Sequence, residues 1–294
     1  MPDLPMQPVP ATQKTVSVVL GSYNRRPFLR AALDSIRANG MDLPYEIIVV
    51  DGGSTDGSLR YLASQKDVIT IIQHNRGRFR GRPVERRSWG YFMNLGFKAA
   101  QGKYILMVSD DCLLVPGAIR QGVGLFERLL AGGRPVGALA FYWRDWPGED
   151  RYWVGKTFGR MFVNHGLYLR RVVEALGGFD EERYRFYHAD GDLCLRMWEA
   201  GYEVLDCPDA YVEHYAHANL RARKSNEQGQ LNDWEAYRRR WSHLEQDPAG
   251  AALVRDYTDP HATYRKFPGK AARTARAFRQ YAARLWRGRV PEEK

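Results

Sequence analysis

Cysteine is scarce in this chain, which has 294 residues and only three widely spaced thiols, at Cys112, Cys194 and Cys207. An odd number of cysteines without paired spacing fits no zinc motif and favours free thiols in a reducing compartment. Long apolar runs are also missing, since no stretch reaches the roughly 18 residues that a bilayer-spanning helix needs. Residues 1–12 lack the basic region and apolar stretch of a secretory signal. We therefore expect a cytoplasmic protein.

Acidic residues are too few to balance the basic ones, and the formal net charge is +10. Most of the excess lies near the C-terminus, where nine basic residues and no acidic residue occur between Arg265 and Arg289. The rest of the chain is close to neutral. A nucleic-acid-binding domain carries its basic residues on its folded body, so we expect no nucleic acid partner.

The basic C-terminal segment also has a helical pattern. Apolar residues between Pro268 and Val290 recur at steps of three and four, and arginines occupy much of the rest. A basic amphipathic helix with an aromatic residue near its end, Trp286, suits the surface of an anionic membrane. We predict a basic helical tail over residues 247–294. Peripheral binding to the inner face of the membrane and packing on protein both stay open as its role.

Apolar runs without alternation indicate buried strands in the first part of the chain. Helical patterns separate these strands, which is typical of an α/β fold with a mostly parallel central sheet flanked by helices. Ligands of such sheets bind beyond the carboxyl ends of the strands, where two acidic loops begin at Asp51 and Asp110. The predicted strands cover residues 15–20, 45–50, 68–72 and 104–108.

Seven short motifs follow one another from the first strand onward. They are Ser22-Tyr23-Asn24-Arg25, Asp51–Gly57, Asn94-Leu95-Gly96, Ser109-Asp110-Asp111, Gly177–Asp180, Asp190–Arg196 and His214. In this order they resemble the family 2 glycosyltransferases with the GT-A fold, over about residues 14 to 215. The resemblance implies a GT-A domain over residues 14–246, with a nucleotide-binding half at 14–116 and an acceptor-binding half at 117–246.

The resemblance also implies a binding site for a nucleoside-diphosphate sugar. Asp51 would accept the N3–H of a uracil or thymine ring, which favours UDP or dTDP, and a turn or helix-capping aspartate is the alternative. Gly52 stands where the family usually has a second aspartate, so the nucleotide stays open. Guanidinium groups match phosphate geometry, and spacing favours Arg82 or Arg86 among six arginines of one loop. The donor-binding residues implied are Ser22, Tyr23, Asn24, Asp51, Arg82, Arg86, Asn94 and Asp110.

A metal site is implied at the end of the fourth strand. The diphosphate leaving group gains negative charge, which a hard divalent cation held by carboxylates can neutralise. The resemblance assigns Asp111 as the principal ligand of Mn²⁺ or Mg²⁺ and His214 as a further one, with Asp110 nearer the ribose or the metal. Ser109 replaces a carboxylate of the family pattern, and a pair of solvated loop acids is the alternative.

The candidate catalytic base is Asp190. Inverting transfer requires an acceptor hydroxyl that loses its proton as it attacks the sugar. The family pattern reads Glu-Asp here, whereas this chain has Ala189 before Asp190. A helix N-cap is the alternative or additional role of Asp190, and Asp192 would support or cap.

We therefore expect an inverting, metal-dependent hexosyltransferase of polysaccharide biosynthesis. Its acceptor would be a hydroxyl of a glycan or of a lipid-linked glycan. A sugar nucleotidyltransferase is one alternative, although residues 20–24 lack the glycine-rich loop and basic residue of that class. A silent sugar-nucleotide-binding protein is another, because Ser109 and Ala189 depart from the family pattern.

Overall fold

We describe the protein from a computed structural model. The chain divides into two units, Met1–Arg255 and Asp256–Lys294, and the account below concerns the first. The predicted tail helix between Pro268 and Val290 lies outside the described residues. None of the helices in the described part is long and apolar enough to cross a bilayer. The structure describes residues 15–39, 42–145, 149, 151–215, 229–244 and 252–256.

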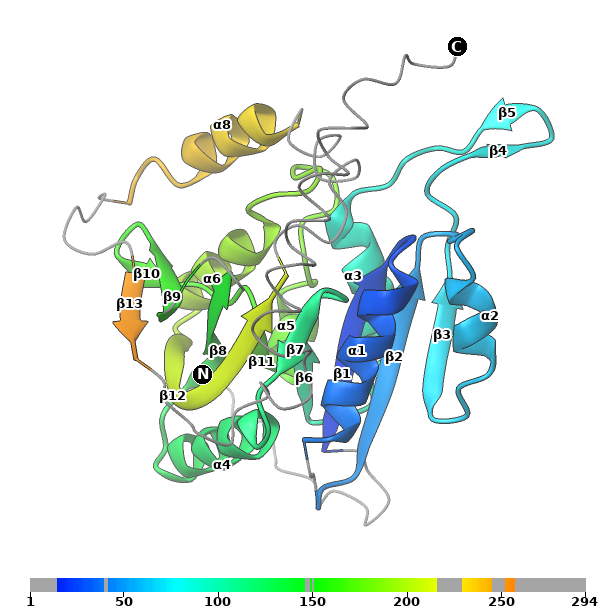
Figure 1. Ribbon diagram of the computed structural model, residues 1–294. Helices are drawn as coiled ribbons and strands as arrows, with labels where there is room; N and C mark the ends of the chain where they lie inside the picture. Colours follow the sequence, from blue (N-terminus) through cyan, green and yellow to red (C-terminus); the bar gives the residue numbers. More distant parts are fainter. Residues whose placement is uncertain are drawn as a thin grey trace. The chain divides into compact units, whose positions relative to one another are not determined.

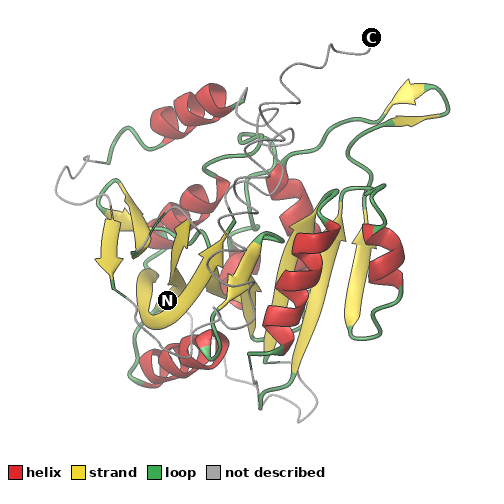
Figure 2. Ribbon diagram, in the orientation of Figure 1, coloured by secondary structure: helices red, strands yellow, loops and turns green. Residues whose placement is uncertain are grey.

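A central sheet organises the first unit (Figures 1 and 2). One half of the sheet contains four parallel strands in the order β6, β1, β2, β3. The side chains of β1, β2 and β6 are nearly all buried, as their unbroken apolar sequences predict. The four strands are β1 (Val16–Ser22), β2 (Tyr45–Asp51), β3 (Val68–Ile72) and β6 (Tyr104–Met107).

The other half of the sheet is mixed. β11 is antiparallel to both β6 and β8, and β12 runs parallel to β8. The sequence did not predict these antiparallel pairs, because strand direction depends on long-range pairing that an apolar run does not encode. The strands of this half are β7 (Cys112–Leu114), β8 (Val136–Asp145), β9 (Tyr152–Thr157), β10 (Arg160–Met161), β11 (Gly166–Leu169), β12 (Glu203–His214) and β13 (Ala252–Arg255).

Helices cover the sheet on both faces, with α1 on one face and α3 on the other (Figure 1). α1 begins with Pro27 in its first turn and buries one apolar stripe, which includes Leu29, Leu33 and Ile36. α3 packs so closely on β1 that a Cβ at Gly96 would lie 2.4 Å from Val19. The helices are α1 (Arg26–Arg37), α2 (Ser58–Ala63), α3 (Trp89–Ala99), α4 (Ala118–Ala131), α5 (Arg170–Ala175), α6 (Ala189–Glu199) and α8 (Gln230–Arg240).

Parallel register brings the carboxyl ends of the central strands together. Ser22 at the end of β1 lies opposite Asp51 at the end of β2, and β6 ends beside them. The strand predicted near residues 203–205 is longer than expected, and it reaches His214. There β12 pairs with β7, so that His214 lies opposite Cys112, directly after the Asp110–Asp111 loop. One edge of the sheet therefore collects most of the predicted site.

The catalytic-domain boundary also differs from the sequence expectation. Residues 252–255 were assigned to the tail that follows residue 246, but they form β13 and pair antiparallel with β9. The first unit accordingly continues to Arg255. Strand β13 has only four residues and two of them are exposed, so its sequence alone carries little strand signal.

Candidate active site

The loop after β2 is built around the carboxylate of Asp51, which is fully buried. Its Oδ1 accepts hydrogen bonds from the backbone of Gly53 and Ser54, at 2.8 and 2.6 Å. Its Oδ2 accepts from the Ser54 hydroxyl at 2.7 Å. These bonds give Asp51 the turn-forming role that the sequence kept as the alternative. A contact with a nucleobase stays a prediction.

The loop after β1 is joined to the loop after β2 through Asn24. Asn24 has a left-handed backbone (φ 52°), which asparagine tolerates better than most residues. Its Oδ1 accepts a hydrogen bond from the backbone N–H of Thr55 at 2.7 Å, and its backbone N–H donates to the Ser54 hydroxyl. The Tyr23 ring lies under the Arg76 guanidinium, and a Cβ at Gly52 would lie 3.2 Å from this ring. Tyr23 therefore fills part of the space that an aspartate at position 52 would need.

Arg25 binds both carboxylates of the predicted metal site, a contact that the sequence analysis missed. Its Nη1 lies 2.7 Å from Asp110 Oδ1 and 2.7 Å from Asp111 Oδ2. Burial raises the pKa of Asp110, the charge of Arg25 opposes this shift, and repulsion from Asp111 adds to it. The guanidinium thus holds two adjacent buried acids together while leaving one oxygen of each carboxylate for another ligand.

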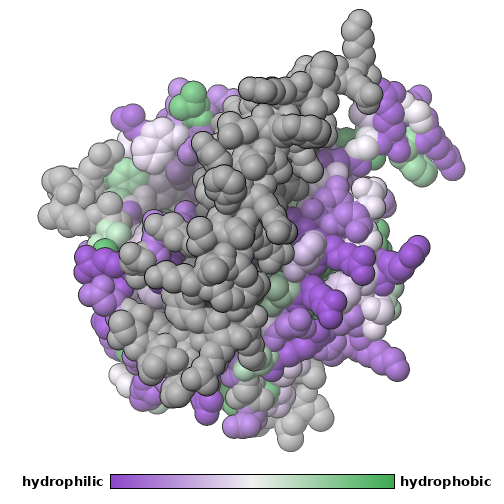
Figure 3. Space-filling view, in the orientation of Figure 1, coloured by the Kyte–Doolittle hydropathy of each residue, from purple (hydrophilic) through white to green (hydrophobic). Residues whose placement is uncertain are grey.

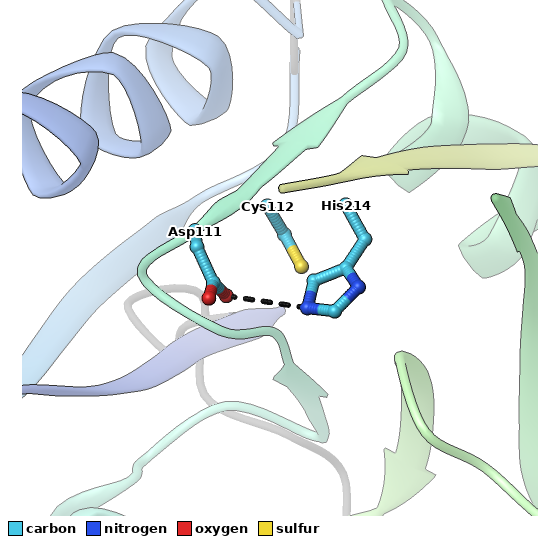
Figure 4. Close-up of side chains that lie close together, drawn as sticks. All are labelled: Asp111, Cys112 and His214. Atoms are coloured by element: carbon cyan, nitrogen blue, oxygen red, sulfur yellow. Dashed lines mark ion pairs between the residues drawn. The ribbon is translucent and has the colours of Figure 1, made fainter. Parts of the chain in front are cut away.

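His214 faces Asp111, one of these two acids, from β12. Its Nε2 lies 3.6 Å from Asp111 Oδ1 (Figure 4). Its Nδ1 lies 2.7 Å from Asp145 Oδ1. Burial lowers the pKa of His214, but the hydrogen bond with Asp145 and the charge of Asp111 outweigh this effect and raise it. A histidine that gives one ring nitrogen to a carboxylate and points the other at an acid has the arrangement of a metal ligand. Asp145 is a supporting residue that no sequence motif indicated.

Several buried polar atoms of the predicted site form no hydrogen bond within the described part of the chain. Buried polar atoms are nearly always paired, so these atoms are candidates for binding a ligand. The Asp111 Oδ1 and Asp110 Oδ2 oxygens need a cation or a donor. Arg86 Nε needs an acceptor. The four such atoms in residues that the sequence singled out are Ser22 Oγ, Arg86 Nε, Asp110 Oδ2 and Asp111 Oδ1.

The structure separates the two arginines that spacing had left as equal candidates. Arg82 is exposed on the hairpin of β4 (Arg78–Phe79) and β5 (Arg82–Pro83), which extends beyond the end of β3 (Figure 1). The surface over this hairpin is largely hydrophilic (Figure 3). Arg86 is partly buried, and burial together with the charges of Arg76 and Arg185 lowers its pKa. A half-buried guanidinium among other cations attracts an anion, which favours Arg86 over Arg82.

Asn94 joins α3 to the segment after α5, and the donor contact that the resemblance implied stays a prediction. Its amide accepts a hydrogen bond from Phe179 N and donates to Phe179 O and to Glu181. A Cβ at Gly178, which has a left-handed backbone, would lie 2.4 Å from Asn94 Oδ1. The Asn94 and Gly177–Asp180 motifs therefore meet in a packing contact between α3 and the segment after α5.

Asp190 lies in the first turn of α6 and not at its N-cap, which is His188. Its carboxylate accepts one hydrogen bond, from its neighbour Gly191. Burial raises the pKa of Asp190 to about 6, while backbone hydrogen bonds oppose the shift. A carboxylate with such a pKa is mostly ionised at neutral pH and can then accept a proton as a base. Asp192, two residues later, is fully buried. Its carboxylate accepts hydrogen bonds from Tyr184, Arg196 and Trp241.

A helix from outside the family motifs holds the loop before Asp190. Asp233 on α8 accepts hydrogen bonds from three successive backbone amides, those of Arg185, Phe186 and Tyr187, at 2.8 to 2.9 Å. The ring of Tyr237, one turn later, stacks on His188. These contacts join α8 to the segment that leads into the candidate base. Sequence reasoning missed them because the two segments are more than 40 residues apart.

Comparison with known proteins identifies the family. The family model for glycosyl transferase family 2 matches residues 17–175, which is more than half of the chain. The chain belongs to glycosyl transferase family 2. A relative of this glycosyltransferase is the uncharacterized glycosyltransferase YwdF of Bacillus subtilis, 27% identical over 67% of this chain and 72% of YwdF. The uncharacterized protein y4gI of Sinorhizobium fredii is 24% identical over 80% of this chain, which spans 28% of that longer protein.

Solved structures confirm the GT-A fold predicted for this glycosyltransferase. The mannosyltransferase PcManGT from Pyrobaculum calidifontis, in complex with GDP-Man and Mn²⁺, has a TM-score of 0.55 at 20% identity. That likeness covers 81% of this chain and 68% of PcManGT. TarS of S. aureus has a TM-score of 0.54 at 16% identity, over 69% of this chain and 37% of TarS.

Proposed function

We propose that this glycosyltransferase moves a hexose from a nucleoside-diphosphate sugar to a hydroxyl group, with inversion at the anomeric carbon. The acceptor would be a glycan or a lipid-linked glycan. The observation that carries the proposal is the set of buried polar atoms without partners in the predicted site. The carboxylates of Asp110 and Asp111 would bind a cation, and the guanidinium of Arg86 would bind an anion. A metal-bound diphosphate would supply both the cation and the anion.

The donor would lie across the carboxyl ends of β1, β2 and β6. Tyr23 would contact the nucleotide beside Gly52, and the Arg76 guanidinium lies over its ring. We propose Arg86 as the residue that binds the diphosphate. UDP or dTDP stays our choice of nucleotide, although PcManGT was solved with GDP-Man and TarS with UDP.

Asp111 and His214 would hold the metal, with Asp110 beside them. The residues fit a divalent cation because Asp111 Oδ1 is buried without a hydrogen bond and faces His214 Nε2. Mn²⁺ or Mg²⁺, when bound, would stabilise the negative charge of the departing diphosphate. Arg25 keeps the two carboxylates in place from the opposite side.

Asp190 would act as the base. The acceptor oxygen forms a bond to the anomeric carbon while the bond to the diphosphate oxygen breaks and its electron pair stays on the diphosphate. The hydroxyl proton passes to the Asp190 carboxylate, whose one internal hydrogen bond leaves an oxygen open for it. In this proposal residues 14–116 would form the nucleotide-binding half and residues 117–246 the acceptor-binding half.

Release of nucleoside diphosphate from a panel of donor sugars tests the proposal. With Mn²⁺ or Mg²⁺ we expect release from at least one UDP or dTDP sugar, and we expect a chelator to abolish it. Asp111→Asn should lose most of the activity while remaining folded, and Asp34→Asn, an exposed acid on α1, serves as its control. Release of pyrophosphate would instead indicate a nucleotidyltransferase. Full activity in excess chelator would contradict the metal assignment.

A further inference from the structure

Cys112 lies beside the two proposed metal ligands. It is the residue of β7 directly opposite His214 of β12, and opposite residues of an antiparallel pair point their side chains to the same side of the sheet. Its sulfur, a carboxylate oxygen of Asp111 and a ring nitrogen of His214 all lie within 4.8 Å of one another. Figure 4 shows the three side chains converging from β7, β12 and the loop between β6 and β7.

The surroundings of this group favour a bound ion. The Asp111 side chain is only 7% exposed, and its Oδ1, which faces His214, accepts no hydrogen bond. His214 Nδ1 is held by Asp145, which leaves Nε2 directed at Asp111. Cys112 is 2% exposed and its thiol contacts a ring nitrogen of His165 at 3.6 Å. Each group that could bind the ion is thus held in orientation by a second residue.

The three groups differ in the metals they prefer. Carboxylate oxygen suits Mg²⁺ and Mn²⁺, whereas thiolate sulfur selects softer ions and imidazole suits zinc well. Three protein ligands with one open position, drawn from cysteine, histidine and carboxylate, match the composition of catalytic zinc sites. A site with oxygen ligands alone would not prefer zinc to Mg²⁺ and Mn²⁺ on the basis of a soft ligand.

We propose that Cys112 is a third protein ligand and that Asp111, Cys112 and His214 form a site for a thiophilic divalent cation, Zn²⁺ in preference to Mn²⁺ and Mg²⁺. The proposal rests on the metal position of the proposed function but requires no turnover. When the ion binds, the S–H bond of Cys112 is replaced by a sulfur–metal bond and the thiol proton is released to solvent. The fourth position stays open for water or a phosphate oxygen.

Cobalt binding to the full-length protein, without donor, tests the site. Co²⁺ replaces zinc in such sites and gives a thiolate-to-cobalt charge-transfer band in the near ultraviolet when a cysteine is bound. We expect this band in the wild-type protein, and we expect Zn²⁺ to remove it at far lower concentration than Mn²⁺. Cys112→Ser and Cys112→Ala should abolish the band. Cys207→Ser, which alters another buried thiol, should retain it.

Several outcomes would overturn the proposal. One is a wild-type protein that binds Co²⁺, measured by equilibrium dialysis, without the charge-transfer band. Others are no Co²⁺ binding at all, or a band that survives in both Cys112 variants. Circular dichroism of each variant establishes that it is folded. Donor turnover by wild-type protein with Mn²⁺ is measured separately, so that a cobalt–thiolate band without turnover would retain this site and contradict the proposed function.

Discussion

At the scale of single residues, Arg25 shows how the protein keeps two adjacent buried acids in a site built for a cation. Its guanidinium bonds one oxygen of Asp110 and one of Asp111. Removing one partner of a buried ion pair is costly because the other charge remains without compensation. Arg25 therefore stabilises and orients both carboxylates. Its removal should lower the free energy of unfolding most when no metal is bound.

Arg25→Met should lower the free energy of unfolding by about 2–4 kcal/mol in chelator, because two neighbouring carboxylates then repel each other in a buried place. Mn²⁺ should raise the melting temperature of this variant more than that of the wild type. Thermal unfolding with and without Mn²⁺ measures both effects. Arg30→Met, at an exposed position of the same helix, is the control. Equal stabilisation of Arg25→Met and wild type by Mn²⁺ would show that Arg25 does not serve the acidic pair.

The raised pKa of Asp190 makes a second prediction at this scale. A base must be ionised, so turnover should rise with pH through about 6, the pKa of Asp190 in the folded protein. Asp190→Asn should lose roughly 10²-fold or more in turnover, since an amide accepts no proton. Donor affinity should change little. Turnover rates between pH 5 and 8, with binding measured by calorimetry, check these effects.

The same variant should be more stable than the wild type near pH 7. The folded state raises the pKa of Asp190, so ionisation costs stability: the protein loses it as pH rises from about 4 to about 6. Asp190→Asn should therefore raise the free energy of unfolding by on the order of 2 kcal/mol at neutral pH. Denaturant unfolding at pH 7 compares the two proteins. A variant with normal turnover and unchanged stability would leave Asp190 as an ordinary first-turn carboxylate.

At the scale of elements, α8 contributes to the candidate site although it lies after the family motifs in the sequence. It presents one carboxylate, Asp233, to three backbone amides in the loop that leads to α6. His188, the N-cap of α6, has a left-handed backbone (φ 67°), a strained conformation that its surroundings must maintain. Because Asp190 follows two residues later, we predict that the contacts of α8 position the proposed base.

Asp233→Ala should reduce turnover while donor binding is retained, because three partly buried amides lose their acceptor and the loop before Asp190 loosens. We also expect the free energy of unfolding to fall by about 2–4 kcal/mol. Glu235→Ala, an exposed acid on the same helix, is the matched control. The pH profile separates positioning from plain destabilisation: a displaced Asp190 changes the apparent pKa of turnover, and an unchanged profile with normal turnover at low temperature would refute the positioning role.

At the scale of the whole molecule, the catalytic unit extends past residue 246 and includes β13. Antiparallel pairing of β13 with β9 completes the sheet beside Tyr152 and Trp153. Arg255, the last residue of β13, lies over the Tyr142 ring of β8. The strand therefore closes an edge that a chain ending at residue 246 would leave open.

Truncation after Asp256 should leave melting temperature and donor turnover at wild-type values. Truncation after Gln246 removes β13 and should destabilise the protein by on the order of 2 kcal/mol through lost cross-strand and cation–π contacts. Thermal unfolding and nucleoside diphosphate release compare both forms with the full chain. Loss of turnover in the longer form would show that residues beyond 256 are needed for catalysis. Sedimentation of the full chain and the longer form with anionic vesicles tests the predicted membrane role of the tail.

The sequence by itself determined the family, the GT-A fold and the four parallel strands whose carboxyl ends carry the acidic loops. These features are local: buried strands are unbroken apolar runs, and Asp51, Asp110 and Asp111 directly follow them. Register then places such loops at one edge of the sheet, as Ser22 and Asp51 show. Motif order alone could not show that Asn94 packs against the segment after α5, and its contact with a donor stays a prediction.

Only the tertiary structure decided which distant residues complete the site. The contacts of Arg25 with the acids span 85 and 86 residues, and that of His214 with Asp145 spans 69. Asp233 reaches its loop across almost 50 residues, and Cys112 meets His214 only because β12 pairs with β7. Such partners leave no periodic or spaced signal in the sequence. They are set by strand pairing and helix packing, which depend on the free energy of the whole fold rather than on any single segment.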